Sequence, residues 1–159
     1  MGKSGRPNHV RIARILLYTG ARVSEILQSH REDIDIHNWE WVLRNVKTRD
    51  KRTRRIVIPE SIRGDVLYFL ETRPDSDYPF AIVTANRLSI LINRWLRDAG
   101  ITGKKLHSFR HTFATRVVND TEYNIRDAQL ALGHSSIRIT EGYVHDRETP
   151  KAINLKIDI

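Results

Sequence analysis

The stretch that decides the fold covers residues 106–143 and reads LHSFRHTFATRVVNDTEYNIRDAQLALGHSSIRITEGY. Its first part predicts a buried helix, because apolar residues recur there at helical spacing (Phe109, Phe113, Ala114, Val117, Val118). Ser108 stands where an N-cap belongs, with a hydroxyl that can accept from the N–H groups of the first turn. A second helical run, 124–132, ends at Gly133, a residue typical of the position after a helix. The stretch therefore predicts helices separated by tight corners.

Four side chains of this stretch suit phosphate chemistry: His107, Arg110, His134 and Tyr143. His107 and Arg110 are three apart at a helix start, so they can project together. An arginine in a first turn opposes the helix dipole, and an anion held there would explain its position. The break at 133–136 lets the chain turn His134 and Tyr143 toward one centre. Each residue alone also fits an ordinary role in packing or at the surface, so only the constellation points to chemistry.

A fifth candidate, Arg22, lies far upstream in TGARVSEIL. A helix expected over 10–18 ends at Thr19-Gly20, and a second short helix is expected over 22–29. Arg22 then stands in a first turn, and two arginines at two helix starts favour one shared phosphate site. Glu25 can hold a neighbouring basic side chain in place, although an exposed helix carboxylate is the ordinary alternative.

HSFRH, LGHSSI and TEGY, in this order and spacing, resemble the tyrosine recombinase family of phage integrases and Xer-type recombinases. TGARVSE resembles the first catalytic motif of the same family, so the similarity runs over residues 19–143. The resemblance implies an α+β, mostly helical fold with a small antiparallel sheet, as in tyrosine recombinase catalytic domains. It also implies that residues 1–159 form one catalytic domain, without the N-terminal core-binding domain that closes a clamp around the duplex.

The small sheet is expected from two segments with strand-like patterning, 39–46 and 55–58, joined by a very basic tip. From its composition alone, such a basic tip is a solvated loop. In the resembled family this hairpin carries a lysine that protonates the leaving oxygen. Lys47, in a KT pair that ends the first strand, matches best, and Lys51 is the rival. Further helices are expected after Pro59 and over 88–99.

The resemblance also implies a mechanism. Tyr143 attacks the scissile phosphate and leaves a 3′-phosphotyrosine and a free 5′-hydroxyl. Arg22 and Arg110 bind the non-bridging oxygens and stabilise the developing negative charge. His107 and His134 donate hydrogen bonds to the same phosphate, and His107 can take the tyrosine proton. Glutamate at position 25 supports the basic cluster. The phosphotyrosine stores the bond energy, so no cofactor, ATP or metal is expected.

The composition agrees with a polyanionic partner, because the formal net charge is +8 and the isoelectric point is about 10.1. The partners expected are a double-stranded DNA recombination site and further recombinase subunits in a tetrameric synapse. Four basic residues are candidates for contacts with the DNA backbone: Lys51, Arg52, Lys104 and Lys105. There is no cysteine, which excludes disulfides and thiol catalysis. Without an apolar leader or a membrane-spanning run, a cytoplasmic protein is expected.

Two other functions share these features: a DNA-binding module without catalysis, and relaxation of DNA like that of a type IB topoisomerase.

Residues 153–159 alternate apolar and polar, which predicts a half-buried strand rather than a helix. Such a strand needs a sheet edge, so we expect it to pair with the hairpin of its own domain or of a neighbour. A frayed terminus is the alternative.

Overall fold

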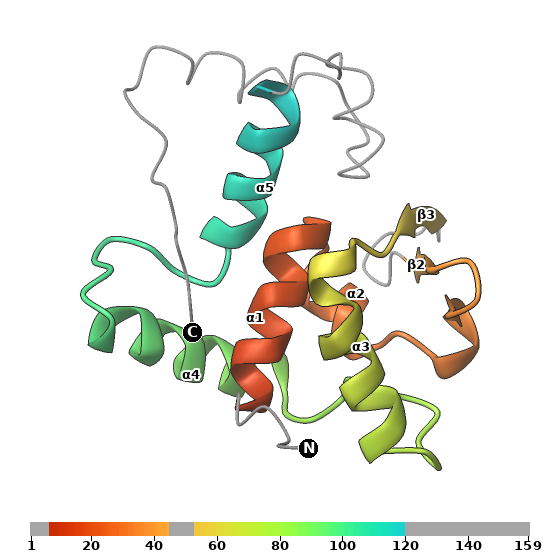
Figure 1. Cartoon of the computed structure of the whole chain (residues 1–159). Helices are drawn as coiled ribbons and strands as arrows, with labels where there is room; N and C mark the ends of the chain where they lie inside the picture. The colour runs from red at the N-terminus through yellow and green to blue at the C-terminus, as the bar shows by residue number, and fades with distance from the viewer. Residues whose placement is uncertain (1–6, 45–52, 120–159) are drawn as a thin grey trace.

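The computed structural model describes residues 7–44 and 53–119. The described elements, in chain order, are α1 (Asn8–Thr19), α2 (Val23–Leu27), the 3-10 helix η1 (Arg31–Asp33), β1 (Ile34–Asp35), β2 (Glu40–Arg44), β3 (Thr53–Val57), α3 (Glu60–Thr72), α4 (Ala85–Asp98) and α5 (Ser108–Asn119). Figure 1 shows their arrangement. The expectation of a mostly helical α+β fold is confirmed. No helix in the described ranges is long and apolar enough to cross a membrane.

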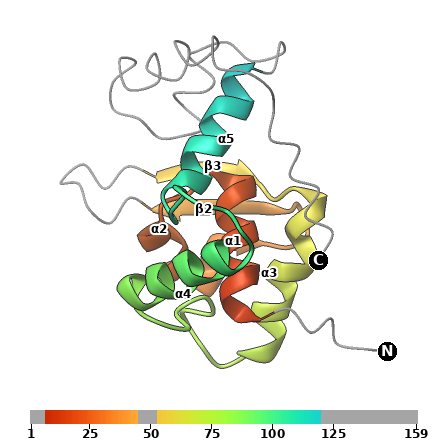
Figure 2. The ribbon, with the colours of Figure 1, turned by 90° about the vertical axis from the view of Figure 1, so that its left-hand side faces the viewer.

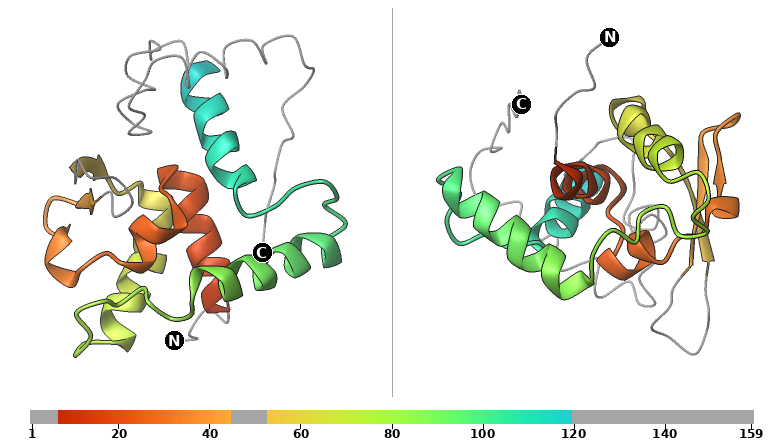
Figure 3. Two further views of the ribbon diagram at one scale, coloured as in Figure 1. Left: turned by 180° about the vertical axis from the view of Figure 1, so that it is seen from behind. Right: turned by 90° about the horizontal axis from the view of Figure 1, so that it is seen from below.

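Helix α1 lies at the centre and contacts α3, α4 and α5, so its apolar residues are buried around most of its circumference (Val10, Ile12, Ala13, Ile15, Leu16, Leu17). The right-hand view of Figure 3 shows α1 nearly end-on among the other helices. The helix ends at Gly20, which has a φ of 60° and donates its N–H to the carbonyl of Leu16 at 3.0 Å. A left-handed residue at this position is a common helix stop that favours glycine. The expected stop at Thr19-Gly20 is therefore confirmed.

The three strands form one antiparallel sheet in the order β1-β2-β3, and Figure 2 shows β2 and β3 side by side. Trp41 and Leu43 of β2 point into the core, where they are 0% and 1% exposed. Their partners across the ladder are Ile56 and Arg54 of β3. Alternation along a strand places Arg54 on the inward face and its neighbour Arg55 outward. The charged side chain of Arg54 thus occupies a position on the face of the sheet that points to the core.

The rest of the core joins the sheet to α3 and α4. The ring of Phe80 lies between Trp41 and Phe69, with centroid distances of 4.8 and 5.2 Å. Helix α4 buries one stripe (Leu88, Ile92, Leu96). It begins three residues before the expected start, because the hydroxyl of Thr84 caps the N–H of Arg87.

A buried ion triad joins α1 to α3. The carboxylate of Asp65 accepts from Arg11 Nη1 and from Arg14 Nε, both at 2.8 Å. Asp65 and Arg11 are 3% and 5% exposed. The guanidinium of Arg11 also stacks on Tyr68, with its Cζ 3.9 Å from the ring centroid. Asp65 thus joins two arginines of α1 to α3, and the ring of Tyr68 adds a cation–π contact to Arg11.

Several local expectations were wrong. The strand expected over 39–46 begins one residue later, because Trp39 has a φ of 55° and belongs to the preceding turn. The helix expected over 22–29 is shorter, with Arg22 as its N-cap. Ser108 does not cap the following turn: its hydroxyl accepts from the upstream N–H of Lys105 at 3.1 Å. In the apolar stripe of α5, Ala114 is fully buried, whereas Phe109, Phe113 and Val117 are only partly buried.

Candidate phosphate-binding site

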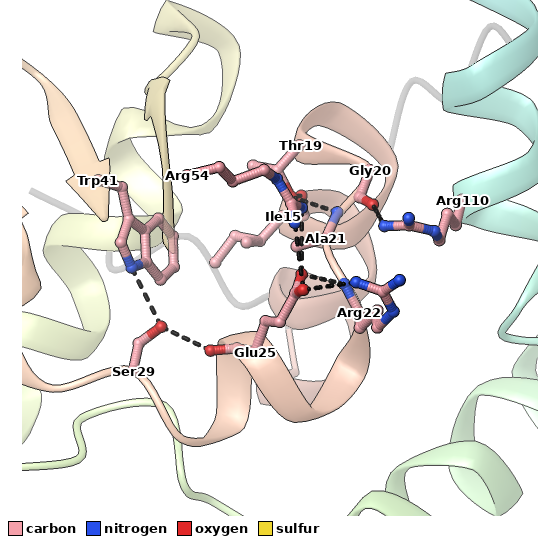
Figure 4. A network of polar contacts seen from close by, with 10 residues as sticks. All are labelled: Ile15, Thr19, Gly20, Ala21, Arg22, Glu25, Ser29, Trp41, Arg54 and Arg110. Carbon is pink, nitrogen blue, oxygen red and sulfur yellow. Dashed lines mark hydrogen bonds and ion pairs between the residues drawn. The ribbon is translucent and has the colours of Figure 1, made fainter. Parts of the chain in front are cut away.

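The site is built on the corner that follows α1. The carbonyl of Gly20 accepts a hydrogen bond of 2.5 Å from Nη1 of Arg110, which comes from the first turn of α5 (Figure 4). The ring of Phe113, one turn further along α5, lies so close to Gly20 that a Cβ there would be 2.2 Å from its Cδ1. Arg22 follows two residues after Gly20. One short corner thus brings together two arginines that are far apart in the sequence.

Arg22 is held by Glu25, three residues along in α2. The Oε2 atom of Glu25 accepts from the backbone N–H of Arg22, and Oε1 accepts from its Nη1, both at 2.8 Å. This is the geometry of a capping box, in which the third helical residue reaches back to the N-cap. Glu25 is only 2% exposed, so the alternative of an ordinary exposed carboxylate is wrong. The side chain of Arg22 is 34% exposed.

A third arginine, Arg54 of β3, reaches the same carboxylate from the opposite side (Figure 4). Its Nη1 lies 3.1 Å from Oε1 of Glu25, and its Nη2 lies 3.0 Å from Oε2. The sequence reasoning missed this residue. The signal was present in TRRIV, where alternation puts Arg54 on the same face as Ile56 and the exposed Arg55 on the other. Which arginine faces inward depends on a register that the sequence alone left open.

The position of α2 is fixed by buried hydrogen bonds as well as by charge. The hydroxyl of Ser29 donates to the backbone carbonyl of Glu25 at 2.7 Å and accepts from Nε1 of Trp41 at 3.1 Å (Figure 4).

Burial disfavours the charged carboxylate of Glu25. The charge of Arg54 and the hydrogen bonds from Arg22 and Arg54 outweigh that effect and hold the pKa of Glu25 below its ordinary value. Glu25 is therefore ionised at neutral pH.

His107 lies beside this cluster, just before α5. Partial burial lowers its pKa, and the nearby charges of His111, Arg110 and Arg22 lower it further. Its ring meets the ring of His111 edge-on, at 4.8 Å between centroids. His111 is itself exposed. The expectation that His107 and Arg110 lie in one neighbourhood is met, although Arg110 is buried whereas only part of His107 is covered.

The carboxylate of Glu25 pairs with Arg22 and Arg54, and Arg110 lies at the same corner, so these four groups together carry a charge of +2 (three positive, one negative) where water is partly excluded. Such a cluster can bind a tetrahedral oxyanion, because guanidinium groups match its oxygens in geometry and charge. Across residues 7–44 and 53–119 no group of three or more His, Cys, Asp or Glu side chains is placed to hold a metal ion.

The remaining candidates divide into two groups. Lys104 and Lys105 are exposed in the connection between α4 and α5. The other predicted site residues lie outside the described residues, as does the strand expected over 153–159: Lys47, Lys51, Arg52, His134 and Tyr143. Their predicted roles stay predictions.

The sequence profile of the phage integrase family matches residues 6–149. The chain belongs to the phage integrase family. The tyrosine recombinase XerA of Pyrococcus furiosus is 31% identical over 161 residues, which cover 91% of this chain and 54% of that protein. The crystal structure of XerA recombinase superposes with a TM-score of 0.69 at 26% identity, over 91% of this chain and 60% of that one.

A second solved structure has the same fold at lower identity. XerH recombinase bound to a palindromic difH substrate, in a post-cleavage complex, gives a TM-score of 0.75 at 22% identity, over 93% of this chain and 45% of that one. The predicted family and fold are therefore confirmed. This integrase-family chain spans about half the length of the curated relatives that it matches, 43% and 54% in two of them.

Proposed function

We propose that this chain is the catalytic domain of a site-specific recombinase that cuts and rejoins double-stranded DNA through a covalent 3′-phosphotyrosine. The observation that supports this most is the meeting of Arg22 and Arg110 at one corner, with Glu25 buried behind Arg22. A basic pair supported in this way suits a phosphodiester whose charge grows during reaction. The net charge of +8 and the family membership agree with a nucleic-acid substrate.

In this proposal the described residues supply the electrostatic part of the reaction. Arg22 and Arg110 bind the two non-bridging oxygens of the scissile phosphate and stabilise the pentacovalent transition state. A lowered pKa keeps His107 neutral near pH 7, so its ring offers one N–H donor and one nitrogen that can take a proton. His107 can thus take the nucleophile's proton or donate to the phosphate.

The covalent step uses the predicted residues beyond the described ranges. The Tyr143 oxygen forms a bond to phosphorus, the bond from phosphorus to the 5′ oxygen breaks, and Lys47 (or Lys51) gives that oxygen a proton. A free tyrosine has a pKa of about 10, so its proton must be taken up nearby. His134 adds a hydrogen bond to the phosphate. The reverse reaction rejoins the strand, and arginine and lysine supply the positive charge that a metal ion supplies in nucleases.

The proposed partners are the DNA site and further subunits of the same enzyme. The XerH structure is a complex of a related fold with its difH substrate, which supports duplex DNA as the ligand. Backbone contacts are assigned to Lys104 and Lys105, and to Lys51 and Arg52 of the basic tip. Assembly into a tetrameric synapse would place two duplexes side by side for exchange.

The test uses a library of nicked duplexes with randomised sequence, in which the short strand released by cleavage diffuses away and traps the intermediate. We expect a denaturant-resistant protein–DNA adduct that maps to Tyr143 and forms in excess EDTA. Tyr143→Phe should bind DNA but form no adduct. Binding without any adduct would identify a DNA-binding module, and a requirement for magnesium would point to a nuclease. Relaxation of supercoiled plasmid without recombinants would favour the topoisomerase-like activity.

A further inference from the structure

We propose that Arg54 is a positioning residue for Arg22, and that it acts through the carboxylate of Glu25. The contacts alone define this arrangement; its consequence for DNA cleavage rests on the proposed function. Arg54 lies outside the set of residues that the family motifs mark in this sequence, and it comes from a different element, the edge strand β3.

The contacts around Glu25 are shared evenly. Oε1 accepts from Nη1 of Arg22 at 2.8 Å and from Nη1 of Arg54 at 3.1 Å. Oε2 accepts from the backbone N–H of Arg22 at 2.8 Å and lies 3.0 Å from Nη2 of Arg54. Each carboxylate oxygen thus has one contact from each arginine. Arg54 thereby fixes the rotation of the carboxylate, and the carboxylate fixes the guanidinium of Arg22.

Burial shows the direction of this support. The side chains of Glu25, Arg54 and Arg22 are 1%, 12% and 34% exposed, so the exposure rises toward Arg22. Arg54 therefore lies behind the site, and Arg22 presents its free face to solvent. Within the described residues the side chain of Arg54 makes its polar contacts with Glu25: Nη1 donates a hydrogen bond, Nη2 lies at ion-pair distance, and neither Nη2 nor Nε has a hydrogen-bond acceptor. The support of Arg54 is thus directed to that carboxylate.

Charge gives Arg54 a second effect. With Arg54 present, one carboxylate is divided between two guanidinium groups, so Arg22 keeps part of its positive charge for an anion. Without Arg54, Glu25 would pair with Arg22 alone, and the local charge from Arg22, Arg54, Arg110 and Glu25 would fall from +2 to +1. A buried carboxylate with one partner fewer also takes up a proton more readily, which would release Arg22 at mildly acidic pH.

The kinetic test compares Arg54→Gln with Arg55→Gln. Arg55 is a matched control, since it lies next along β3, faces solvent and pairs with Glu40 at 2.6 Å. On the nicked-duplex library, single-turnover adduct formation by Arg54→Gln should fall by about 10-fold or more, while DNA affinity stays within about 3-fold. Arg55→Gln should change adduct formation by less than about 2-fold. Arg54→Lys, which keeps the charge, should recover part of the rate and serves if Arg54→Gln does not fold.

A double-variant cycle tests the route through Glu25. If Arg54 acts through this carboxylate, adding Arg54→Gln to Glu25→Gln should slow adduct formation by less than about 2-fold, because Glu25→Gln alone already removes the support. The proposal would be overturned if Arg54→Gln slowed adduct formation equally in the wild type and in Glu25→Gln. Equal effects of Arg54→Gln and Arg55→Gln on this rate would also overturn it. Adduct formation that Arg54→Gln leaves at the wild-type rate would overturn it as well.

A measurement without DNA separates this proposal from the proposed function. Nitrogen-15 NMR of the arginine side chains reports how fast the Arg22 guanidinium rotates. We expect faster rotation in Arg54→Gln and no change in Arg55→Gln, and the change should grow as the pH is lowered toward 5. Unchanged rotation in Arg54→Gln would overturn the positioning role. A wild-type chain that forms no adduct would contradict the proposed function, and the NMR comparison would still decide the role of Arg54.

Discussion

Replacing Gly20 by alanine tests how closely α5 is docked on the corner that holds the arginines. Gly20 has a φ of 60°, and a Cβ there would lie 2.2 Å from Cδ1 of Phe113 and 2.7 Å from its Cε1. The left-handed conformation costs a residue with a Cβ about 1–2 kcal/mol. Forcing the Phe113 ring aside adds the cost of overpacking, about 1–3 kcal/mol. Gly20→Ala should therefore lower the free energy of unfolding by about 2–5 kcal/mol.

Two other glycines separate these contributions. Gly100 has a φ of 76° but no atom within 4 Å of an added Cβ, so Gly100→Ala should cost only the conformational part, about 1–2 kcal/mol. Gly64 lies inside α3 with no atom within 4 Å and no positive φ, so Gly64→Ala should raise the free energy of unfolding by about 0.5–1 kcal/mol. The expected order of stability is Gly64→Ala, wild type, Gly100→Ala, Gly20→Ala.

The assay is urea unfolding of the full chain, with the transition followed by both fluorescence and circular dichroism. A shift of the midpoint at constant slope reports stability alone. Combining Gly20→Ala with Phe113→Ala should cost less than the sum of the two single changes, since the smaller side chain makes room for the new Cβ. The reasoning is refuted if Gly20→Ala costs no more than Gly100→Ala, or if its effect adds independently to that of Phe113→Ala.

Three further outcomes follow from the same structure. Asp65→Ala should lower the free energy of unfolding by about 3–5 kcal/mol, because it removes the buried carboxylate that Arg11 and Arg14 share; a urea midpoint like that of Arg55→Ala would contradict this. The NMR titration of His107 should have its midpoint below pH 6.5, and this midpoint should shift upward with orthovanadate bound. Because the folded state lowers the pKa of His107, the stability linked to its neutral form is present above pH 6.5 and is lost as the pH falls. The logarithm of DNA affinity should fall with that of salt concentration by about 0.9 per phosphate contacted, and a flat response would argue against a DNA-binding role for the basic surface.

Periodicity alone predicted the long helices well, because α1 and α4 bury apolar stripes whose spacing is visible in the sequence. Features that depend on a distant partner were less visible. The strand β1 has two residues and exists through its pairing with β2, so no local pattern indicated it. The hydroxyl of Ser108 had two possible acceptor roles within a few residues, and the tight turn before α5 selected the upstream N–H.

The candidate site shows the same division. Arg22, Glu25, His107 and Arg110 were predicted as one group, because helix starts and family motifs mark them, and the structure brings them together. Arg54 was missed because its role depends on which of two adjacent arginines faces inward. That choice follows from the register between β3 and β2, in which Arg54 pairs with the buried Leu43. This register is a feature of the tertiary structure.

The bond from Arg110 to the carbonyl of Gly20 has a consequence for how this domain can diverge. Its acceptor is a main-chain atom, so a substitution at position 20 leaves the acceptor in place and only a change of Arg110 itself removes the donor. The separation of Arg22 and Arg110 then depends on the backbone path of a single turn. Insertions and deletions in the connections between α2 and α5 can accumulate without altering that separation, provided that they leave β3 and its Arg54 in place. New surface loops could thus arise around one unaltered pair of arginines.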